Sequence, residues 1–257
     1  MDPLVIKLGG RLVNDNTALK EIFQAIADYQ QDHKRMLVIV HGGGDLIDEF
    51  MQMLNLPVLK TNGLRITPKD HILFVVAALA GIANKLLLAE AKKYQVDSIG
   101  LCLTEGEATY IEPMNTSLGC VGKSYSGNGR LLNTLYCAGY VPIISSIGIT
   151  EKGELLNINS DDAAVSIAHT LKGELLLLSD VAGVLDENNA FINTITRQKA
   201  QELIKSGTIR DGMAVKVAAA CAAVELLNKS VGIAGMQQAN ELVALFDGKG
   251  IGTRVMS

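Results

Sequence analysis

Two glycine-rich turns are candidate anion-binding sites, because each follows a short apolar run near the start of the chain. Gly9-Gly10 follows residues 4–8, and Gly42-Gly43-Gly44 follows residues 36–40 and His41. Glycine lets the backbone approach an anion closely and direct successive N–H groups at it, and a following helix adds its positive end. Either turn alone is equally well explained as a tight connection without a ligand. Together they favour phosphate binding, because ligands of open α/β sheets bind at the carboxyl ends of strands.

Two lysines interrupt apolar segments. Lys7 lies in LVIKLGG, and an interior parallel strand should be almost entirely apolar, so a charge there is costly unless it has a function. An edge strand whose lysine reaches solvent is an equal alternative, although the adjacent glycine turn favours phosphate binding. Lys216 lies in DGMAVKVAAACAAVELL, near the start of a predicted helix. It could reach a phosphate, but taken alone a solvated position on the helix surface explains it slightly better.

Arg65 and a group of amide and carboxylate side chains are the remaining polar candidates. Arg65, in NGLRIT, could bind a carboxylate through two parallel hydrogen bonds, although surface ion pairs are the commoner role of arginine. The segment NINSDDAA places Asn157, Asn159, Asp161 and Asp162 between a predicted hairpin and a helix. Carboxylates at that position often only cap the helix, so the spacing leaves their role open.

Composition and motifs exclude several classes of protein. A formal net charge of -4 and the absence of Trp argue against a broad nucleic-acid-binding surface. Gly122-Lys123-Ser124 is not a P-loop, because Ser117 occupies the position of the first glycine. The four cysteines form no CxxC pair and are expected to be reduced, buried thiols in the cytoplasm. The apolar run of residues 72–83 is shorter than the roughly 20 residues that cross a bilayer, so we expect no membrane contact.

The elements that must position these residues alternate between strands and helices. Such alternation predicts one α/β domain with an open, mainly parallel central sheet flanked by helices on both faces, a three-layer αβα arrangement. A hairpin is predicted over residues 148–158, and Thr67 is predicted to cap a helix that begins at Pro68. The predicted strands are residues 4–8, 36–40, 98–103, 141–146, 174–178, 230–234 and an edge strand at 252–256. The predicted helices are residues 19–29, 160–171, 197–205 and 213–228, with another starting at residue 45.

Six segments in this order resemble the amino acid kinase family. They are VIKLGG at 5–10, VIVHGGG at 38–44, TNGLRIT at 61–67, NINSD at 157–161, LLLLSDVAGVL at 175–185 and DGMAVK at 211–216. Within the family, NGLR followed by NINSD is similar to the members that act on N-acetyl-L-glutamate. The resemblance implies phosphorylation of the side-chain carboxylate of N-acetyl-L-glutamate in arginine biosynthesis, with ATP and Mg²⁺ as cosubstrate and no tightly bound cofactor.

The resemblance also implies a role for each matching residue. Lys7 and Lys216 would stabilise the transition state, Asp161 would hold both lysines, and the Gly10 and Gly43 N–H groups would bind the moving phosphoryl group. Gly43, Gly44, Arg65 and Asn157 would bind the acid substrate, in a lobe of about residues 1–173. ATP would bind a lobe of about residues 174–257, at Asp180, Val181, Ala182, Gly183, Val184, Leu185, Thr208, Ile209 and Arg210. No residue is assigned as a metal ligand.

The chain departs from the family pattern at some positions, and other functions stay open. Ser160 and Ala214 replace residues that many members have as alanine and as a larger aliphatic residue, and residues 101–108 differ from a common family pattern. The alternatives are a carbamate, glutamate, aspartate or UMP kinase, or a sensor without catalysis on the same fold. Because no helical segment precedes residue 4, the resemblance implies an arginine-insensitive homodimer rather than a hexamer.

Overall fold

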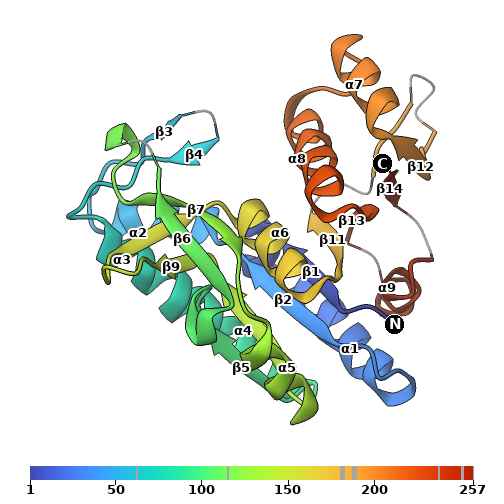
Figure 1. Cartoon of the computed structure of the whole chain (residues 1–257), viewed down its shortest axis with the longest axis horizontal. Coiled ribbons are helices and arrows are strands. Elements are labelled where there is room, and N and C mark those ends of the chain that lie inside the picture. The colour runs from blue at the N-terminus through green and yellow to red at the C-terminus, as the bar shows by residue number, and fades with distance from the viewer. Residues whose placement is uncertain are drawn as a thin grey trace.

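The architecture is a long twisted sheet with helices on both faces, which confirms the predicted fold class (Figure 1). The computed structural model describes residues 1–61, 63–114, 116–179, 183–186, 190–236, 238–249 and 252–256. The eight strands of the main sheet lie in the order β12-β14-β13-β11-β1-β2-β8-β5. They are β1 Leu4–Leu8, β2 Leu37–His41, β5 Ser98–Leu101, β8 Val141–Ser145, β11 Glu174–Ser179, β12 Thr194–Thr196, β13 Val231–Gly235 and β14 Thr253–Met256.

Alternate residues of the central strands face two separate cores, because successive side chains of a strand point to opposite faces. In β1, Val5 belongs to one core, and Leu4, Ile6 and Leu8 belong to the other. Helices α5 (Arg130–Cys137), α6 (Ser160–Leu171), α7 (Arg197–Lys205) and α8 (Asp211–Leu227) contribute to the first core. Helices α1 (Asn16–Asp32), α4 (Asn84–Lys93) and α9 (Ala239–Phe246) contribute to the second. The parity of β1 therefore directs Lys7 to the face that α6 covers.

A second, four-stranded sheet lies beyond one end of the main sheet, in the order β6-β7-β10-β9 (Figure 1). Its strands are β6 Thr109–Pro113, β7 Val121–Ser126, β9 Ile147–Ile149 and β10 Leu155–Ile158. The antiparallel pair β9–β10 is the hairpin predicted over residues 148–158. A short hairpin of β3 (Lys60–Thr61) and β4 (Leu64–Arg65) lies nearby, and α2 (Gly44–Met53) and α3 (Ile72–Val76) pack in a smaller core with Ile147.

One helical run continues from Ile72 to Lys93, so it is longer than the apolar run of residues 72–83. It combines α3, a π-helical segment (Ala77–Ala83) and α4, and by length and composition alone it could cross a membrane. One side of the run is buried in the cores. The other side is apolar and exposed at Leu73, Phe74, Ile82 and Leu86. The run is therefore a core helix on one side and an uncovered apolar surface on the other.

Two local predictions were wrong. Thr67 does not cap a helix, because the helix begins at Ile72 and the backbone of Thr67 pairs with residues 118–120 instead. Strand β14 is not at the edge of the sheet, since it lies between β12 and β13 and runs antiparallel to β13. The expectation that all cysteines are buried holds for Cys221 alone among the four, and Cys137 is exposed.

The pairing at Thr67 leads to a stability prediction for Gly119. A Cβ atom at Gly119 would lie 2.2 Å from the Thr67 carbonyl oxygen, and φ of Gly119 is +73°. Gly119→Ala should lower the free energy of unfolding by about 3 kcal/mol, since strain from positive φ costs about 1–2 kcal/mol and the clash adds to it. Gly139→Ala is the control, because φ is +86° there and nothing lies within 4 Å. Equal losses in urea denaturation would contradict the predicted clash.

Candidate functional site

The two glycine turns meet at one edge of the main sheet. They follow β1 and β2, which are parallel neighbours, so their carboxyl ends lie side by side. A Cβ atom on Gly10 would lie only 2.9 Å from the Gly44 nitrogen. A Cβ atom on Gly43 would lie 2.9 Å from a methyl carbon of Leu79, in the π-helical segment. A side chain at Gly10 would therefore force the two turns apart, whereas one at Gly43 would displace the Leu79 side chain.

Lys7 and Asp161 form an ion pair beside these turns. Strand β1 lies between β11 and β2, so the edge-strand alternative for Lys7 is excluded. The Lys7 side chain is 13% exposed, and its Nζ lies 2.8 Å from Asp161 Oδ1. Asn159 begins α6 by accepting hydrogen bonds from the N–H groups of Asp161 and Asp162. Of these two carboxylates, Asp161 pairs with Lys7, and Asp162 lines a separate cavity with Lys123 and His169.

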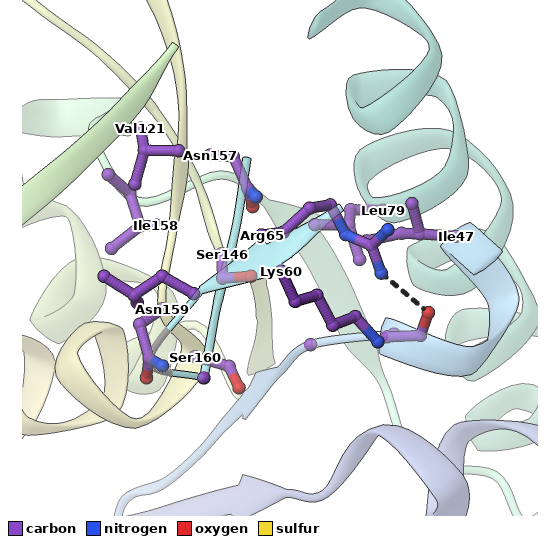
Figure 2. A pocket seen from close by; sticks show the side chains of 15 residues that line it. Ile47, Lys60, Arg65, Leu79, Val121, Ser146, Asn157, Ile158, Asn159 and Ser160 are labelled. Carbon is purple, nitrogen blue, oxygen red and sulfur yellow. Dashed lines mark hydrogen bonds between the residues drawn. The ribbon is translucent and has the colours of Figure 1, made fainter. Parts of the chain in front are cut away.

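A cavity of about 200 Å³ opens beside the second glycine turn (Figure 2). Gly43 and Gly44 line it together with Arg65 from β4 and Asn157 from β10, which are the residues predicted to bind the acid substrate. Figure 2 shows the side chains of Arg65 and Asn157, which come from different elements, at the cavity. Asn157 is held at the wall by a hydrogen bond of 3.3 Å from its Nδ2 to Thr67 Oγ1.

Arg65 is fixed on one side and has an unsatisfied donor on the other. Its Nη2 donates to the Gly44 carbonyl at 3.1 Å and to the Asp48 carboxylate. Its Nη1 is buried and has no hydrogen-bond partner within the described part of the chain. Burial alone would raise the pKa of Asp48, but hydrogen bonds from Lys60 and Arg65 outweigh it and lower the pKa. The guanidinium is thus held in place by a carboxylate that stays ionised.

Lys216 and the residues predicted to bind ATP lie in the second half of the chain. Lys216 is half-buried in α8, which packs against α6, the helix that begins beside Asp161. Val184 is buried and its N–H donates to Thr253 Oγ1 of β14 at 2.8 Å. Ile209 is buried in the core, whereas Arg210, the last residue before α8, is exposed. Asp180, Val181 and Ala182 lie outside the described residues.

The remaining predicted nucleotide residues differ in their exposure. Leu185 is exposed and forms an isolated bridge with Phe191. Thr208 is half-buried, and its hydroxyl lies 3.0 Å from that of Ser206. Gly183 adopts a φ of +154°. Gly183, Leu185 and Thr208 are not among the residues that line the cavity beside Arg65, and their role in ATP binding stays a prediction.

Comparison with known proteins agrees with these features. The model of the amino acid kinase family matches residues 2–235. The chain belongs to the amino acid kinase family. It is 51% identical to a protein of Pectobacterium atrosepticum named acetylglutamate kinase, and the match covers 100% of both chains.

Solved structures share the architecture of this amino acid kinase. The smu.665 protein of Streptococcus mutans UA159 superposes with a TM-score of 0.81 at 30% identity, over 99% of this chain and 98% of that one. The N-acetylglutamate synthase of Neisseria gonorrhoeae, complexed with coenzyme A and N-acetylglutamate, gives a TM-score of 0.84 at 22% identity. That match covers all of this chain and 59% of the synthase, and it shows the fold alone.

Sequence reasoning missed several residues of the site. Lys60 lines the cavity, and its Nζ lies 2.7 Å from Asp48 Oδ2. An available signal was the Asn-Gly dipeptide at 62–63, which is typical of a two-residue hairpin turn and would have placed Lys60 opposite Arg65. Ser146 also lines the cavity, and no motif indicated it, whereas Asn159, which lines the cavity too, was a candidate from the NINSDDAA segment without an assigned role.

The buried histidine before the second turn should make stability depend on pH. Burial lowers the pKa of His41 from 6.5 to about 4. Because the unfolded chain then binds more protons at acidic pH, the associated stability is present above pH 6.5 and is lost toward pH 4. Between pH 7 and pH 4.5 this should cost about 2–3 kcal/mol.

The His41→Asn variant lacks this group, so its free energy of unfolding should fall by that much less between the two pH values. Urea denaturation of both proteins at each pH measures the difference. Equal losses of unfolding free energy in the two proteins would show that His41 does not titrate between the two pH values.

Proposed function

We propose that this amino acid kinase transfers the γ-phosphoryl group of ATP to the side-chain carboxylate of N-acetyl-L-glutamate, giving an acyl phosphate for arginine biosynthesis. The similarity to proteins named acetylglutamate kinase extends over the whole chain. The observation that carries the proposal is the buried Arg65 Nη1 beside the second glycine turn, which has no hydrogen-bond partner among the described residues. It supplies a site for a carboxylate next to a site for a phosphoryl group.

Arg65 is suited to the α-carboxylate of the substrate. A buried donor without an acceptor is costly, and a carboxylate in the cavity would satisfy Nη1 with a charge-assisted hydrogen bond. Asp48 holds Nη2 on the other side, so the guanidinium presents its open donor in a fixed direction. Asn157, a further wall of the cavity, would bind another polar group of the same substrate.

The reaction itself requires charge stabilisation rather than a general base. The acceptor carboxylate is already ionised at pH 7, since a glutamate side chain has a pKa of about 4.3. Its approach to the phosphoryl group brings like charges together, at about 4 kcal/mol for two unit charges 4 Å apart with an effective dielectric of about 20. The Lys7 ammonium, the Lys216 ammonium and the Gly10 and Gly43 N–H groups would offset this repulsion as the new P–O bond forms and ADP leaves.

Asp161 would act by orientation. Its carboxylate lies against Lys7, which keeps the ammonium directed along the edge of the sheet where the glycine turns meet. It would hold Lys216 in the same way from the neighbouring helix. The carboxylate makes no contact with substrate in this scheme, so we assign it a positioning role.

ATP would bind the second half of the chain and arrive with Mg²⁺ as part of the substrate, held mainly by phosphate and water oxygens. Asp180, Val181, Ala182, Gly183, Val184, Leu185, Thr208, Ile209 and Arg210 would form its site. The Ile209 side chain is buried and its N–H donates to the Leu203 carbonyl, so any contact of Ile209 with a nucleotide would be through its backbone carbonyl. We assign residues 1–173 to a lobe for the acid substrate and residues 174–257 to a lobe for ATP.

The protein would act as a cytoplasmic homodimer. The uncovered apolar surface of Leu73, Phe74, Ile82 and Leu86 supports this assembly, because apolar side chains on neighbouring turns of a helix favour contact with another protein surface. Ile82→Lys combined with Leu86→Lys should shift the dimer to a monomer in sedimentation. An unchanged sedimentation coefficient would exclude this surface as the interface.

A substrate panel tests the proposed function directly. ATP consumption should be fastest with N-acetyl-L-glutamate and slow with glutamate, aspartate, carbamate and uridine monophosphate. Faster turnover of another acceptor would assign the chain to that branch of the family. A lack of turnover with all five would favour a sensor on the same fold.

Arg65→Lys should mainly weaken binding of the acid substrate. Lysine keeps the charge but cannot bind Asp48 and a substrate carboxylate at fixed angles. The KM for N-acetyl-L-glutamate should rise by about 10-fold or more, while the KM for ATP changes little. Arg130→Lys, an exposed residue of α5, is the matched control. Equal kinetics of both variants and the unmodified enzyme would remove Arg65 from the acid-binding site.

Lys216→Ala should lower kcat by about 100-fold or more, with little change in either KM. The interaction of Lys216 grows as negative charge develops in the transition state, and loss of one such group costs about 10²–10³ in rate. Lys20→Ala on the exposed face of α1 is the control. Steady-state kinetics that leave kcat unchanged would exclude Lys216 from the mechanism.

A further inference from the structure

His41 is a fully buried imidazole at the base of the second glycine turn. It is the last residue of β2, directly before Gly42-Gly43-Gly44, and the scheme above gives it no role. Its Nδ1 lies 2.8 Å from the Gly42 carbonyl oxygen, and its Nε2 lies 3.1 Å from Asn84 Nδ2. Both ring nitrogens therefore have partners, one in the turn and one on α4.

The direction of these hydrogen bonds follows from the chemistry of the groups. An ammonium can only donate, so Lys85 Nζ, 3.2 Å from Asn84 Oδ1, requires that atom to be the amide oxygen. The Asn84 nitrogen then donates to the Ile143 carbonyl at 2.9 Å and to His41 Nε2. Since Nε2 accepts, the proton of a neutral ring is on Nδ1, and Nδ1–H donates to the Gly42 carbonyl.

Asn84 packs directly against the backbone of β5. A Cβ atom on Gly100 would lie 2.0 Å from Asn84 Oδ1, so the amide is in close contact with that strand. Asn84 is itself buried, at 1% exposure. Each residue therefore donates a hydrogen bond to the next in the series Lys85, Asn84, His41 and Gly42. The last acceptor is the Gly42 carbonyl in the glycine turn.

Fixing the Gly42 carbonyl also fixes the direction of the Gly43 N–H, because a trans peptide unit is planar. The carbonyl of Gly42 and the N–H of Gly43 belong to one peptide unit and point to opposite sides of it. With the carbonyl held by a buried ring, the N–H is directed away from that ring. Gly43 lines the cavity, and its N–H has no acceptor within the described part of the chain.

We propose that His41 is a positioning residue, whose Nδ1–H holds the Gly42 carbonyl so that the Gly43 N–H faces the transferring phosphoryl group. The inference rests on the proposed function, in which the Gly43 N–H binds that group. It predicts a residue needed for the rate of phosphoryl transfer that never contacts substrate.

The state of the ring supports this role. Burial lowers the pKa of His41 to about 4, opposed only in part by the hydrogen bond to Gly42. The ring is therefore neutral at pH 7 and carries one N–H, which the Asn84 amide places on Nδ1. Lys85 is the charged group of the series, and it reaches the ring only through Asn84.

Three substitutions separate positioning from filling of the core. Asparagine can place an N–H near the position of Nδ1, glutamine can place an amide near Nε2, and phenylalanine keeps the ring shape without either nitrogen. His41→Gln and His41→Phe should lower kcat by roughly 10- to 100-fold. A misdirected Gly43 N–H would stabilise the transition state much less, so the loss in rate should approach that caused by removing a donor. The KM for each substrate should change less than about 3-fold. His41→Asn should retain most of the kcat of the unmodified enzyme.

The control is His169→Gln, which exchanges an exposed histidine of α6 and should leave kcat unchanged. A His41→Gln or His41→Phe enzyme with normal kcat would overturn the proposal. So would a His41→Asn enzyme as slow as His41→Phe. Absence of N-acetyl-L-glutamate kinase activity in the unmodified protein would instead contradict the proposed function.

Nitrogen NMR of the histidine-labelled unmodified protein provides a test that does not depend on activity. The chain has four histidines, and a single conservative variant assigns the His41 signals. At pH 7 we expect a protonated Nδ1 and an unprotonated Nε2. A proton on Nε2 would overturn the proposal, whatever the kinetics of the variants.

Discussion

The ion pair between Lys7 and Asp161 is the contact on which the rest of the site depends. A lysine in a central strand is tolerated only if its charge has a partner, since an unpaired buried ammonium is strongly destabilising. Asp161 provides that partner from the start of α6, so the pair joins strand β1 to the helix that covers it. Replacing the pair with apolar residues could stabilise the fold. The presence of the pair is therefore better explained by chemistry at this edge of the sheet than by stability.

Around that pair, close backbone packing limits which residues the site can contain. The two glycine turns approach each other at a distance that leaves no room for a Cβ atom on Gly10, and the Leu79 side chain lies against Gly43. Neighbouring polar side chains then orient the second turn by hydrogen bonds to its carbonyls. Arg65 bonds the Gly44 carbonyl, and His41 bonds the Gly42 carbonyl. The Gly42 and Gly44 carbonyls of this turn are thus held by side chains, and the Gly43 carbonyl between them accepts from the Ile47 N–H.

The sheet and much of the site were predictable from the sequence because their signals are local. Apolar runs that end in glycines identified β1 and β2, and the cost of a charge in a central strand identified Lys7. Local signals were insufficient where distant pairing decides the structure. Thr67-Pro68 has the features of a helix start, yet backbone hydrogen bonds to residues 118 and 120 hold it extended. Strands β6 and β7 were missed because residues 109–113 and 121–126 are short and rich in polar residues.

The orientation of side chains was the second feature that the sequence could not predict. Asp161 and Asp162 are adjacent at the start of one helix, and only the docking of α6 against β1 decides which of them meets Lys7. The same holds for His41, since a single histidine after an apolar strand carries no sign of the amide that sets its proton. The partners of both residues come from distant segments of the chain. Motifs therefore identified the candidate side chains. The directions in which those side chains point could be determined only from the three-dimensional structure.

The position of β14 has a consequence for the cooperativity of the second half of the chain. Strand β14 lies between β12 and β13 and pairs with both of them. Strand β12 is the outermost strand on that side of the main sheet, so β14 joins it to the rest of the sheet. Local opening of β14 would therefore also detach β12, and the two strands should open as one cooperative unit.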